Sequence, residues 1–238
     1  MASGMLVVFG LGMFGTLSTL PLFLENLMDY PSSEAGLVMA PQGIASFCAM
    51  ALFSQIGGKV PARWVVLTGL ILAATGASHL AGLTLEIAPI NVVAALACLG
   101  FGTGLFFVSM STMAYQTIDP ARTSEAAALY NFSRTIGQSI GISIASTIQA
   151  RQAQIAWNEL GGHIDPFNLN FSDWLAIRGL GENTPMGMAR VAQLLEAQSE
   201  LIAFNHTFAV IALSFFVLMP AALLLRSNKT GARPAPAH

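Results

Sequence analysis

The residues best suited to chemistry gather around Arg134, the one formally charged side chain well inside a long apolar segment of this sequence. Successive residues of an α-helix are about 100° apart, so a helix here places Asn131 and Gln138 beside Arg134. Gly137 and Gly141 share this small and polar face. The opposite face carries large apolar residues, namely Leu129, Phe132, Ile136 and Ile140. Such a helix either lines a polar path, where the arginine contacts a ligand, a carboxylate or a moving gate, or ties the arginine to backbone carbonyls of a neighbouring helix.

No catalytic or metal-binding signature accompanies these residues. The sequence contains no H-E-x-x-H, no G-x-S-x-G and no Walker loop, and its histidines and cysteines lack metal-ligand spacing. The long apolar segments also contain no Asp or Glu that could act as an acid, a base or a metal ligand. We therefore predict that the chain is not an enzyme and that it binds neither a metal nor a cofactor.

The elements that carry these residues are predicted to be membrane-spanning helices. Only 9% of the residues are charged, against roughly 25% in an ordinary soluble domain, and there is no basic face for a nucleic acid. A helix needs about 20 apolar residues to cross ~30 Å of hydrocarbon. Six segments satisfy this, namely 4–24, 35–57, 64–85, 90–114, 127–149 and 202–225. The expected fold class is an all-α membrane protein with six transmembrane helices, in which the charge of Arg134 must face protein or water.

The charged residues between these segments predict a topology. Alternate loops form two groups, one with six basic and two acidic residues, the other with three basic and ten acidic residues. Lys and Arg concentrate in cytoplasmic loops, so the first group, which includes Lys59 and Arg63, is predicted to be cytoplasmic. Both termini are then cytoplasmic as well. The chain divides into five transmembrane helices (1–150), an outer loop (151–200), a last transmembrane helix (201–226) and a cytoplasmic tail (227–238).

The outer loop 151–200 ends in a predicted amphipathic helix. Pro185 follows a Thr184 N-cap, the expected order at a helix start. From there Met188, Val191 and Leu195 fall on one side of the helix. We expect this helix to lie at the outer membrane interface and to run into the last span. It serves either as a structural lead-in or as a lid or docking surface.

Small residues and a proline indicate where helices pack or bend. Small-xxx-small spacing lets two helix backbones approach closely. Two pairs of glycines have it, namely Gly100 with Gly104 and Gly137 with Gly141. Pro41 lies inside the second segment with Gly43 close behind it, and a proline there removes one backbone hydrogen bond and kinks the helix. These positions are candidates for helix packing or gating.

Several of these stretches together resemble a known family. The run from Gly100 to Gly104, and the pattern Asn-x-x-Arg-x-x-Gly-x-x-x-Gly over 131–141, resemble late helices of major facilitator superfamily exporters, most of all the EmrB/QacA-type fourteen-helix drug:proton antiporters. Residues 34–43 and 201–208 are similar to further helices of the same group. The basic loop with Lys59 and Arg63 also resembles the superfamily's inner loop, but Gly58 stands where the usual aspartate would be.

The resemblance implies a function for the chain as part of a longer permease. It would be the carboxy-terminal half of a multidrug exporter in the bacterial inner membrane, exchanging hydrophobic or cationic small molecules for protons. Arg134, Asn131 and Gln138 would line the inner-facing part of the substrate path. The implied partners are the lipid bilayer, the amino-terminal half of the transporter and, in a Gram-negative host, a periplasmic adaptor protein, but no nucleic acid.

A function of another class stays open. Proton coupling needs a carboxylate within the membrane, where burial favours the neutral form and exposure restores the charge. The six apolar segments hold none. A stand-alone six-helix membrane protein, or an inactive transporter remnant without active transport, is therefore the alternative for the isolated chain.

Overall fold

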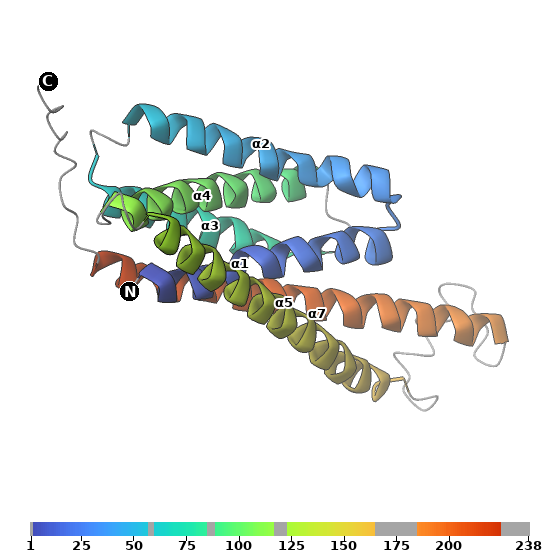
Figure 1. Cartoon of the computed structure of the whole chain (residues 1–238). Coiled ribbons are helices and arrows are strands. Elements are labelled where there is room, and N and C mark those ends of the chain that lie inside the picture. Colours follow the sequence, from blue (N-terminus) through green and yellow to red (C-terminus); the bar gives the residue numbers. More distant parts are fainter. Residues whose placement is uncertain (1, 57–59, 85–88, 117–122, 165–184, 225–238) are drawn as a thin grey trace, which may run out of the picture.

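The computed structural model describes residues 2–56, 60–84, 89–116, 123–164 and 185–224 (Figure 1). All regular structure within these ranges is helical. The helices are α1 (Ala2–Leu22), a π-helical turn η1 (Phe23–Leu27), α2 (Ser32–Ile56), α3 (Ala62–Leu80), α4 (Pro89–Gln116), α5 (Thr123–Gly161) and α7 (Pro185–Leu223).

Five of the long helices are apolar enough to cross a membrane. They are α1 together with η1, and α2, α3, α4 and α7. The sixth expected span, 127–149, lies inside α5, which has the length of a span but falls short of that apolar content. Asn131, Arg134 and Gln138, with repeated serines and threonines, are the reason. The all-α membrane fold is confirmed, and α5 is the helix least suited to contact lipid on all sides.

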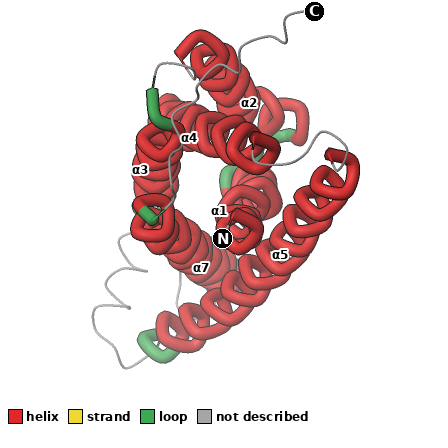
Figure 2. Tube along the Cα trace, turned by 60° about the vertical axis from the view of Figure 1, so that its left-hand side comes forward, coloured by secondary structure: helices red, strands yellow, loops and turns green. Residues whose placement is uncertain are grey.

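The helices pack as a bundle in which α4 and α7 each contact several of the other helices. Helix α4 lies between α2 and α3, and α7 contacts α1, α3 and α5 (Figure 2). Helix α1 packs closely along α5. As a result α2 and α5 lie at the edges of the bundle.

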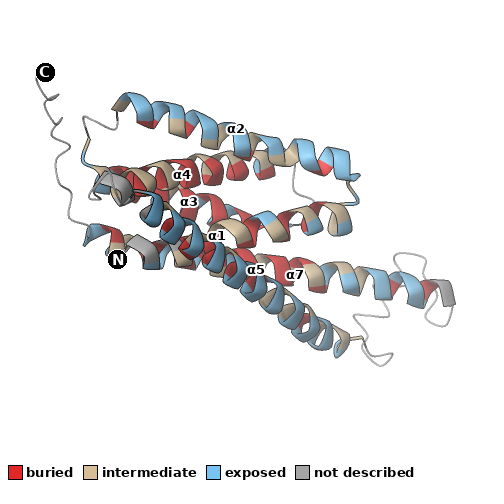
Figure 3. Cartoon of the chain, viewed as in Figure 1, coloured by how far each residue is buried: buried red, intermediate tan, exposed pale blue. Residues whose placement is uncertain are grey.

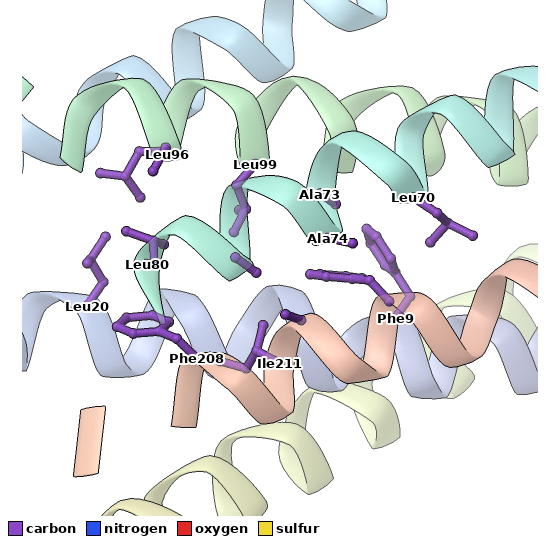
Figure 4. Packing of buried hydrophobic residues seen from close by; sticks show 14 of the residues in the cluster. Phe9, Leu20, Leu70, Ala73, Ala74, Leu80, Leu96, Leu99, Phe208 and Ile211 are labelled. Atoms are coloured by element: carbon purple, nitrogen blue, oxygen red, sulfur yellow. The ribbon is translucent and has the colours of Figure 1, made fainter. Parts of the chain in front are cut away.

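Aromatic and aliphatic side chains from α1, α3, α4 and α7 fill the interior (Figure 4). Phe9 of α1 stacks on Phe106 of α4 with ring centroids 3.9 Å apart, and it contacts Phe215 of α7 at 5.9 Å. Offset stacking contributes about 0.5–1.5 kcal/mol per aromatic pair. Lipid tails are as apolar as this core, so close packing rather than escape from water must hold such helices together.

The edge helices α2 and α5 present mostly exposed surfaces (Figure 3). Phe47 of α2 is 74% exposed, and Phe132 of α5 is 63% exposed. On α2 only Ala35, Gln42, Ala49 and Phe53 are buried. These surfaces must meet lipid or another protein in the native setting.

Helices α5 and α7 are longer than a membrane requires. Each has 39 residues, or about 58 Å at 1.5 Å per residue. Helix α7 runs past the other helices at the end of the bundle where α2 begins, and α5 leans away from the bundle there (Figure 1). The segment 151–200 is thus helical at both ends, because α5 continues to Gly161 and α7 begins at Pro185. No glycine or proline separates Gly187 from Pro220, so the lead-in helix continues into the last span without a break.

The ends of the helices alternate between the two sides of the bundle. The first residues of α1, α3 and α5 and the last residues of α2, α4 and α7 lie at one end (Figure 1). This order agrees with the alternation of basic and acidic loops. Which end is cytoplasmic stays a prediction from the loop charges.

Candidate functional site

Arg134 lies where three helices meet. Its guanidinium carbon, reaching out from α5, is 5.2 Å from the ring centre of Phe107 on α4 and 5.7 Å from that of Phe14 on α1. Both distances are within the ~6 Å over which an aromatic face attracts a cation. Arg134 is half-buried, and it follows Thr123, the first residue of α5, by about 16 Å along the helix. The arginine is therefore deep in the bundle but still accessible.

The guanidinium group has hydrogen-bonding capacity left over. An arginine side chain carries five N–H donors and keeps its positive charge in proteins. Within the described ranges, Arg134 forms no ion pair and donates no hydrogen bond, to a backbone carbonyl or to a side chain; its contacts are the two ring faces. The site can thus accept an anion or a hydrogen-bond acceptor from outside the described part of the chain.

A hydrogen bond beside Arg134 joins α4 to α5. The hydroxyl oxygens of Tyr130 and Ser111 are 2.8 Å apart, and the Tyr130 ring meets Phe107 edge to face at 6.4 Å. Ser111 also hydrogen-bonds the Phe107 carbonyl at 2.8 Å. Phe107 therefore contacts both Arg134 and Tyr130, and the two helices are connected at the level of the arginine.

Helix α5 has a polar stripe between its buried face and its apolar exposed face. Asn131 is exposed and Gln138 is half-buried on this stripe. The Thr135 hydroxyl on this stripe bonds within the helix, to the Asn131 carbonyl at 2.9 Å. The exposed polar residues on the stripe are Asn131, Thr135, Ser139 and Ser146. A carboxamide such as that of Asn131 is poorly placed against hydrocarbon, so the stripe suits water or a polar protein surface.

Glycines bring the α1 and α5 backbones into direct contact. A Cβ atom at Gly10 would lie 2.8 Å from the Gly137 carbonyl carbon, and one at Gly141 would overlap the Leu11 backbone. No side chain fits at either position without moving a helix. Arg134 lies three residues before Gly137 on α5. The close contact of the two backbones therefore keeps Arg134 at the same level as Phe14 of α1.

A second glycine contact joins α2 to α4. A Cβ at Gly100 would collide with the Gln42 carbonyl, and one at Gly104 would lie 2.6 Å from the Ser46 carbonyl oxygen. Ser46 also donates a hydrogen bond of 2.7 Å to the Gly100 carbonyl. The α2–α4 contact therefore combines close backbone approach with an interhelical hydrogen bond.

The other candidate gating residues lie apart from Arg134. Pro41 is half-buried within α2, and Gly43 is exposed with open space around it. Arg63 is exposed near the start of α3, with its guanidinium carbon 5.5 Å from the centre of the Trp64 ring. Lys59 lies outside the described residues. The described contacts do not bring Pro41, Gly43 or Arg63 together with Arg134, Asn131 and Gln138.

An acidic cavity of about 700 Å³ opens at the opposite end of the bundle from the start of α5. Its lining comes from η1 and the adjoining loop, with Glu25 and Asp29, and from α7, with Arg190, Glu196 and Glu200. Partial burial raises the pKa of the Glu200 carboxyl, and the nearby charge of Glu196 raises it further. Glu200 precedes the apolar segment 201–226, so it belongs to the mouth of the bundle rather than to its apolar interior.

Sequence patterns missed the aromatic partners of Arg134. Phe14 and Phe107 come from distant helices, and only helix packing brings them to α5. A faint signal is the presence of aromatic residues at the same predicted membrane depth as the arginine. Among the described residues, no group of three or more His, Cys, Asp or Glu side chains could hold a metal ion.

A comparison with known families gives a match to this chain. A family model described as Major Facilitator Superfamily matches residues 2–142. This range covers α1 to α4 and the part of α5 that carries Arg134, Gly137 and Gly141.

Individual relatives are distant in sequence and longer. The chain is 28% identical over 211 residues to multidrug export protein EmrB of Escherichia coli (strain K12), covering 87% of this chain and 41% of that protein. It is 25% identical over 215 residues to fatty acid resistance protein FarB of Neisseria gonorrhoeae, covering 89% of this chain and 42% of FarB. Multidrug transporter protein MdtP of Bacillus subtilis (strain 168) is 23% identical over 180 residues, covering 75% of this chain and 33% of MdtP. The chain spans about two fifths of the length of the first two relatives.

Proposed function

Because the chain belongs to the Major Facilitator Superfamily, we propose that it forms the carboxy-terminal six-helix half of a proton-coupled exporter of hydrophobic small molecules. Transporters of this superfamily bind substrate between two six-helix halves that rock around it. The observation that carries the proposal is Arg134, an accessible charge on the polar side of α5 with aromatic rings from α1 and α4 around it. The names of EmrB and MdtP, which refer to several drugs, support a broad substrate range.

The exposed edges of the bundle support a second half. The face of α2 around Phe47 is mostly uncovered, and the polar stripe of α5 is ill suited to lipid. A second six-helix bundle would cover the α2 face and turn the stripe toward a central, hydrated path. Arg134, Asn131 and Gln138 would then line the inner part of that path.

Proton coupling is assigned to the other half. The six apolar segments of this chain contain no Asp or Glu, whereas coupling needs a carboxylate that can change its charge inside the membrane. We therefore place the coupling carboxylates in the amino-terminal half and the cation of Arg134 in this one.

The bacterial inner membrane is the proposed location, with both termini in the cytoplasm. The outer parts of α5 and α7 would then stand in the periplasm. Their exposed residues, which include Ile155, Trp157 and Met188, offer a surface for an adaptor protein, a role proposed by analogy with drug exporters.

Deletion of the gene tests the exporter role without assuming the charge of the substrate. We expect the deletion strain to become more sensitive to at least one compound in a panel of neutral, anionic and cationic hydrophobic toxins. Return of the gene should restore resistance, and collapse of the proton gradient should abolish the restored efflux. Unchanged sensitivity across the panel would contradict the proposal.

The alternative is a stand-alone six-helix membrane protein without active transport. The lack of a carboxylate in the apolar segments favours it for the isolated chain. Both roles predict that sealed vesicles containing only this chain show no substrate-driven proton uptake. Substrate-driven proton movement by the chain by itself would refute both the alternative and the assignment of coupling to another half.

A further inference from the structure

We propose that the acidic cavity beside η1 is a pH-sensitive latch, which closes η1 onto α7 when its carboxyl groups are protonated and opens when they are ionised. One wall of the cavity comes from η1 and the adjoining loop, and the other comes from the first part of α7. The loop charges predict that this end of the bundle lies outside the cytoplasm. The latch therefore responds to the external pH. It goes beyond the proposed function, because it involves neither Arg134 nor a substrate.

The two facing walls of the cavity carry charges of the same sign. Glu25 and Asp29 line it on the η1 side, and Glu196 and Glu200 line it on the α7 side. Within the described ranges, none of these four carboxylates forms an ion pair. Like charges repel each other, and the repulsion ends when one of them is neutralised. Ionisation of the carboxyl groups thus drives the walls apart, and protonation allows them to approach.

One arginine does not balance this negative charge. Arg190 also lines the cavity, and its guanidinium donates a hydrogen bond of 3.2 Å to the side-chain oxygen of Gln193. The described lining therefore holds four acidic residues and one basic residue. The other titratable side chains near this end on described elements lie outside the lining, namely Tyr30, Glu34, His79, Arg151, Glu159, His163 and His206. Among the described residues, the cavity loses its negative charge only when its own carboxylates take up protons.

Glu200 links protonation to closure. It is half-buried on α7, and this burial raises the pKa of its carboxyl group, with the charge of Glu196 raising it further. Closure of the cavity removes more water from Glu200, and burial disfavours the ionised form of a carboxyl group. Protonation therefore favours the closed arrangement. This effect is complete below the ordinary pKa of the carboxyl group and is lost as the pH rises through the raised pKa.

The backbone at η1 provides a hinge for this movement. The π-helical turn is a rare conformation that is frequent at functional sites. Asp29, just after it, has a φ of 54°, a left-handed conformation that is uncommon for a residue other than glycine. At the start of η1, Phe23 is fully buried and meets Phe204 of α7 edge to face at 5.2 Å. This end is fixed to α7, so Glu25 and Asp29 approach or leave α7 about a fixed point.

Distances between two spin labels on the purified chain in lipid nanodiscs test the latch. Asn26→Cys and Ala192→Cys place the labels at exposed positions on η1 and α7, and Ala192 lies outside the cavity lining. Cys48→Ser and Cys98→Ser remove the native thiols. We expect the mean distance to be shorter at pH 4 than at pH 8 by at least about 2 Å. High salt at pH 8 should reduce this difference, because salt screens the repulsion between accessible charges.

Variants of the carboxyl groups separate the latch from general effects of pH. Glu196→Gln combined with Glu200→Gln should keep the labels at the short distance at both pH values, because the α7 wall then stays neutral. Glu200→Asp retains a titratable group and should retain a response to pH, which a purely structural role of Glu200 does not predict. Glu159→Gln removes an exposed carboxyl group of α5 outside the cavity lining and should leave the full response. If the double variant does not fold, Glu25→Gln and Glu196→Gln take its place, and each should reduce the shift.

The latch is refuted by any of three results in folded protein. They are a distance that does not change with pH, a longer distance at pH 4 than at pH 8, and a full pH response in the variants that neutralise the α7 wall. No transported compound enters the measurement. An unchanged drug sensitivity of the deletion strain would therefore remove the exporter role and leave the latch, whereas a pH-independent distance would remove only the latch.

Discussion

At the scale of single residues, the Tyr130–Ser111 hydrogen bond is the simplest contact to test. It joins α4 to α5 at 2.8 Å beside Arg134. Tyr130→Phe removes the hydroxyl and keeps the ring near Phe107, so we expect a loss of about 0.5–1.5 kcal/mol in the free energy of unfolding. Thermal unfolding in detergent measures it.

A double-mutant cycle isolates that bond from other contacts of the two residues. Ser111→Ala should cost a similar amount, and the double variant should cost less than the sum of the single ones. Strict additivity would show that the two hydroxyl groups are not coupled.

Glu200 gives a pH-dependent prediction. Burial and the charge of Glu196 raise the pKa of Glu200 above 4.5, so the folded chain holds this proton more tightly than the unfolded chain. The stabilising effect of protonation is complete below the ordinary pKa and is lost as the pH rises through the raised one. Glu200→Gln should therefore raise the melting temperature at pH 7 and leave it nearly unchanged at pH 4.

The gain should be small because Glu200 is largely hydrated. Glu196→Gln removes one of the two causes and should produce a smaller gain of the same sign. A variant that gains more stability at pH 4 than at pH 7 would show that the sign of the shift is wrong.

At the scale of elements, the glycine contact between α1 and α5 is the feature most sensitive to substitution. Gly141→Ala adds a methyl group where the Leu11 backbone already lies. Overpacking of this kind costs about 1–3 kcal/mol, and the separation of α1 from α5 should also displace Arg134 from Phe14. Melting temperature and fluorescence of a tryptophan placed at Phe14 would report both effects.

Gly43→Ala is the matched control. Gly43 lies within α2 with nothing within 4 Å of an added Cβ, and alanine favours a helix by up to about 1 kcal/mol over glycine. The control should be neutral or slightly stabilising. Equal losses at Gly43 and Gly141 would show that close backbone contact is not the cause.

Sequence patterns could predict most of the helices, but not how far two of them extend. Apolar, uncharged runs identify α1 to α4 and the last span, and the absence of charge over 135–150 identifies the span within α5. The continuation to Gly161 escapes this reading because polar residues, among them Arg151 and Glu159, interrupt the apolar ones over 151–161. Their partner is α7, where a Cβ at Gly161 would lie 3.9 Å from the Leu195 side chain.

The candidate site was predictable only in part for a similar reason. Periodicity brings Asn131, Arg134 and Gln138 together because they share one helix. Phe14 and Phe107 reach the arginine from α1 and α4, and no spacing rule within one segment relates residues so far apart. The π-helical turn Phe23–Leu27 also lacked a clear signal, although Pro21 just before it cannot donate a backbone hydrogen bond.

At the scale of the whole molecule, the alternation of helix ends makes the topology testable. Loop charges predict that the ends of α2 and α4 face the cytoplasm together with both termini. Green fluorescent protein fused after His238 should fluoresce, and alkaline phosphatase inserted after Ile164 should be active. If alkaline phosphatase is active when fused after His238 and inactive when inserted after Ile164, the topology is the reverse of the predicted one.

The unbroken course of α7 has a mechanical consequence. Residues 185–200 extend about 24 Å beyond the start of the apolar span, and no flexible joint separates them from it. The helix therefore works as a lever. A tilt of about 10° of the span would sweep its tip through roughly 4 Å, so small rotations inside the membrane are transmitted and enlarged at the surface.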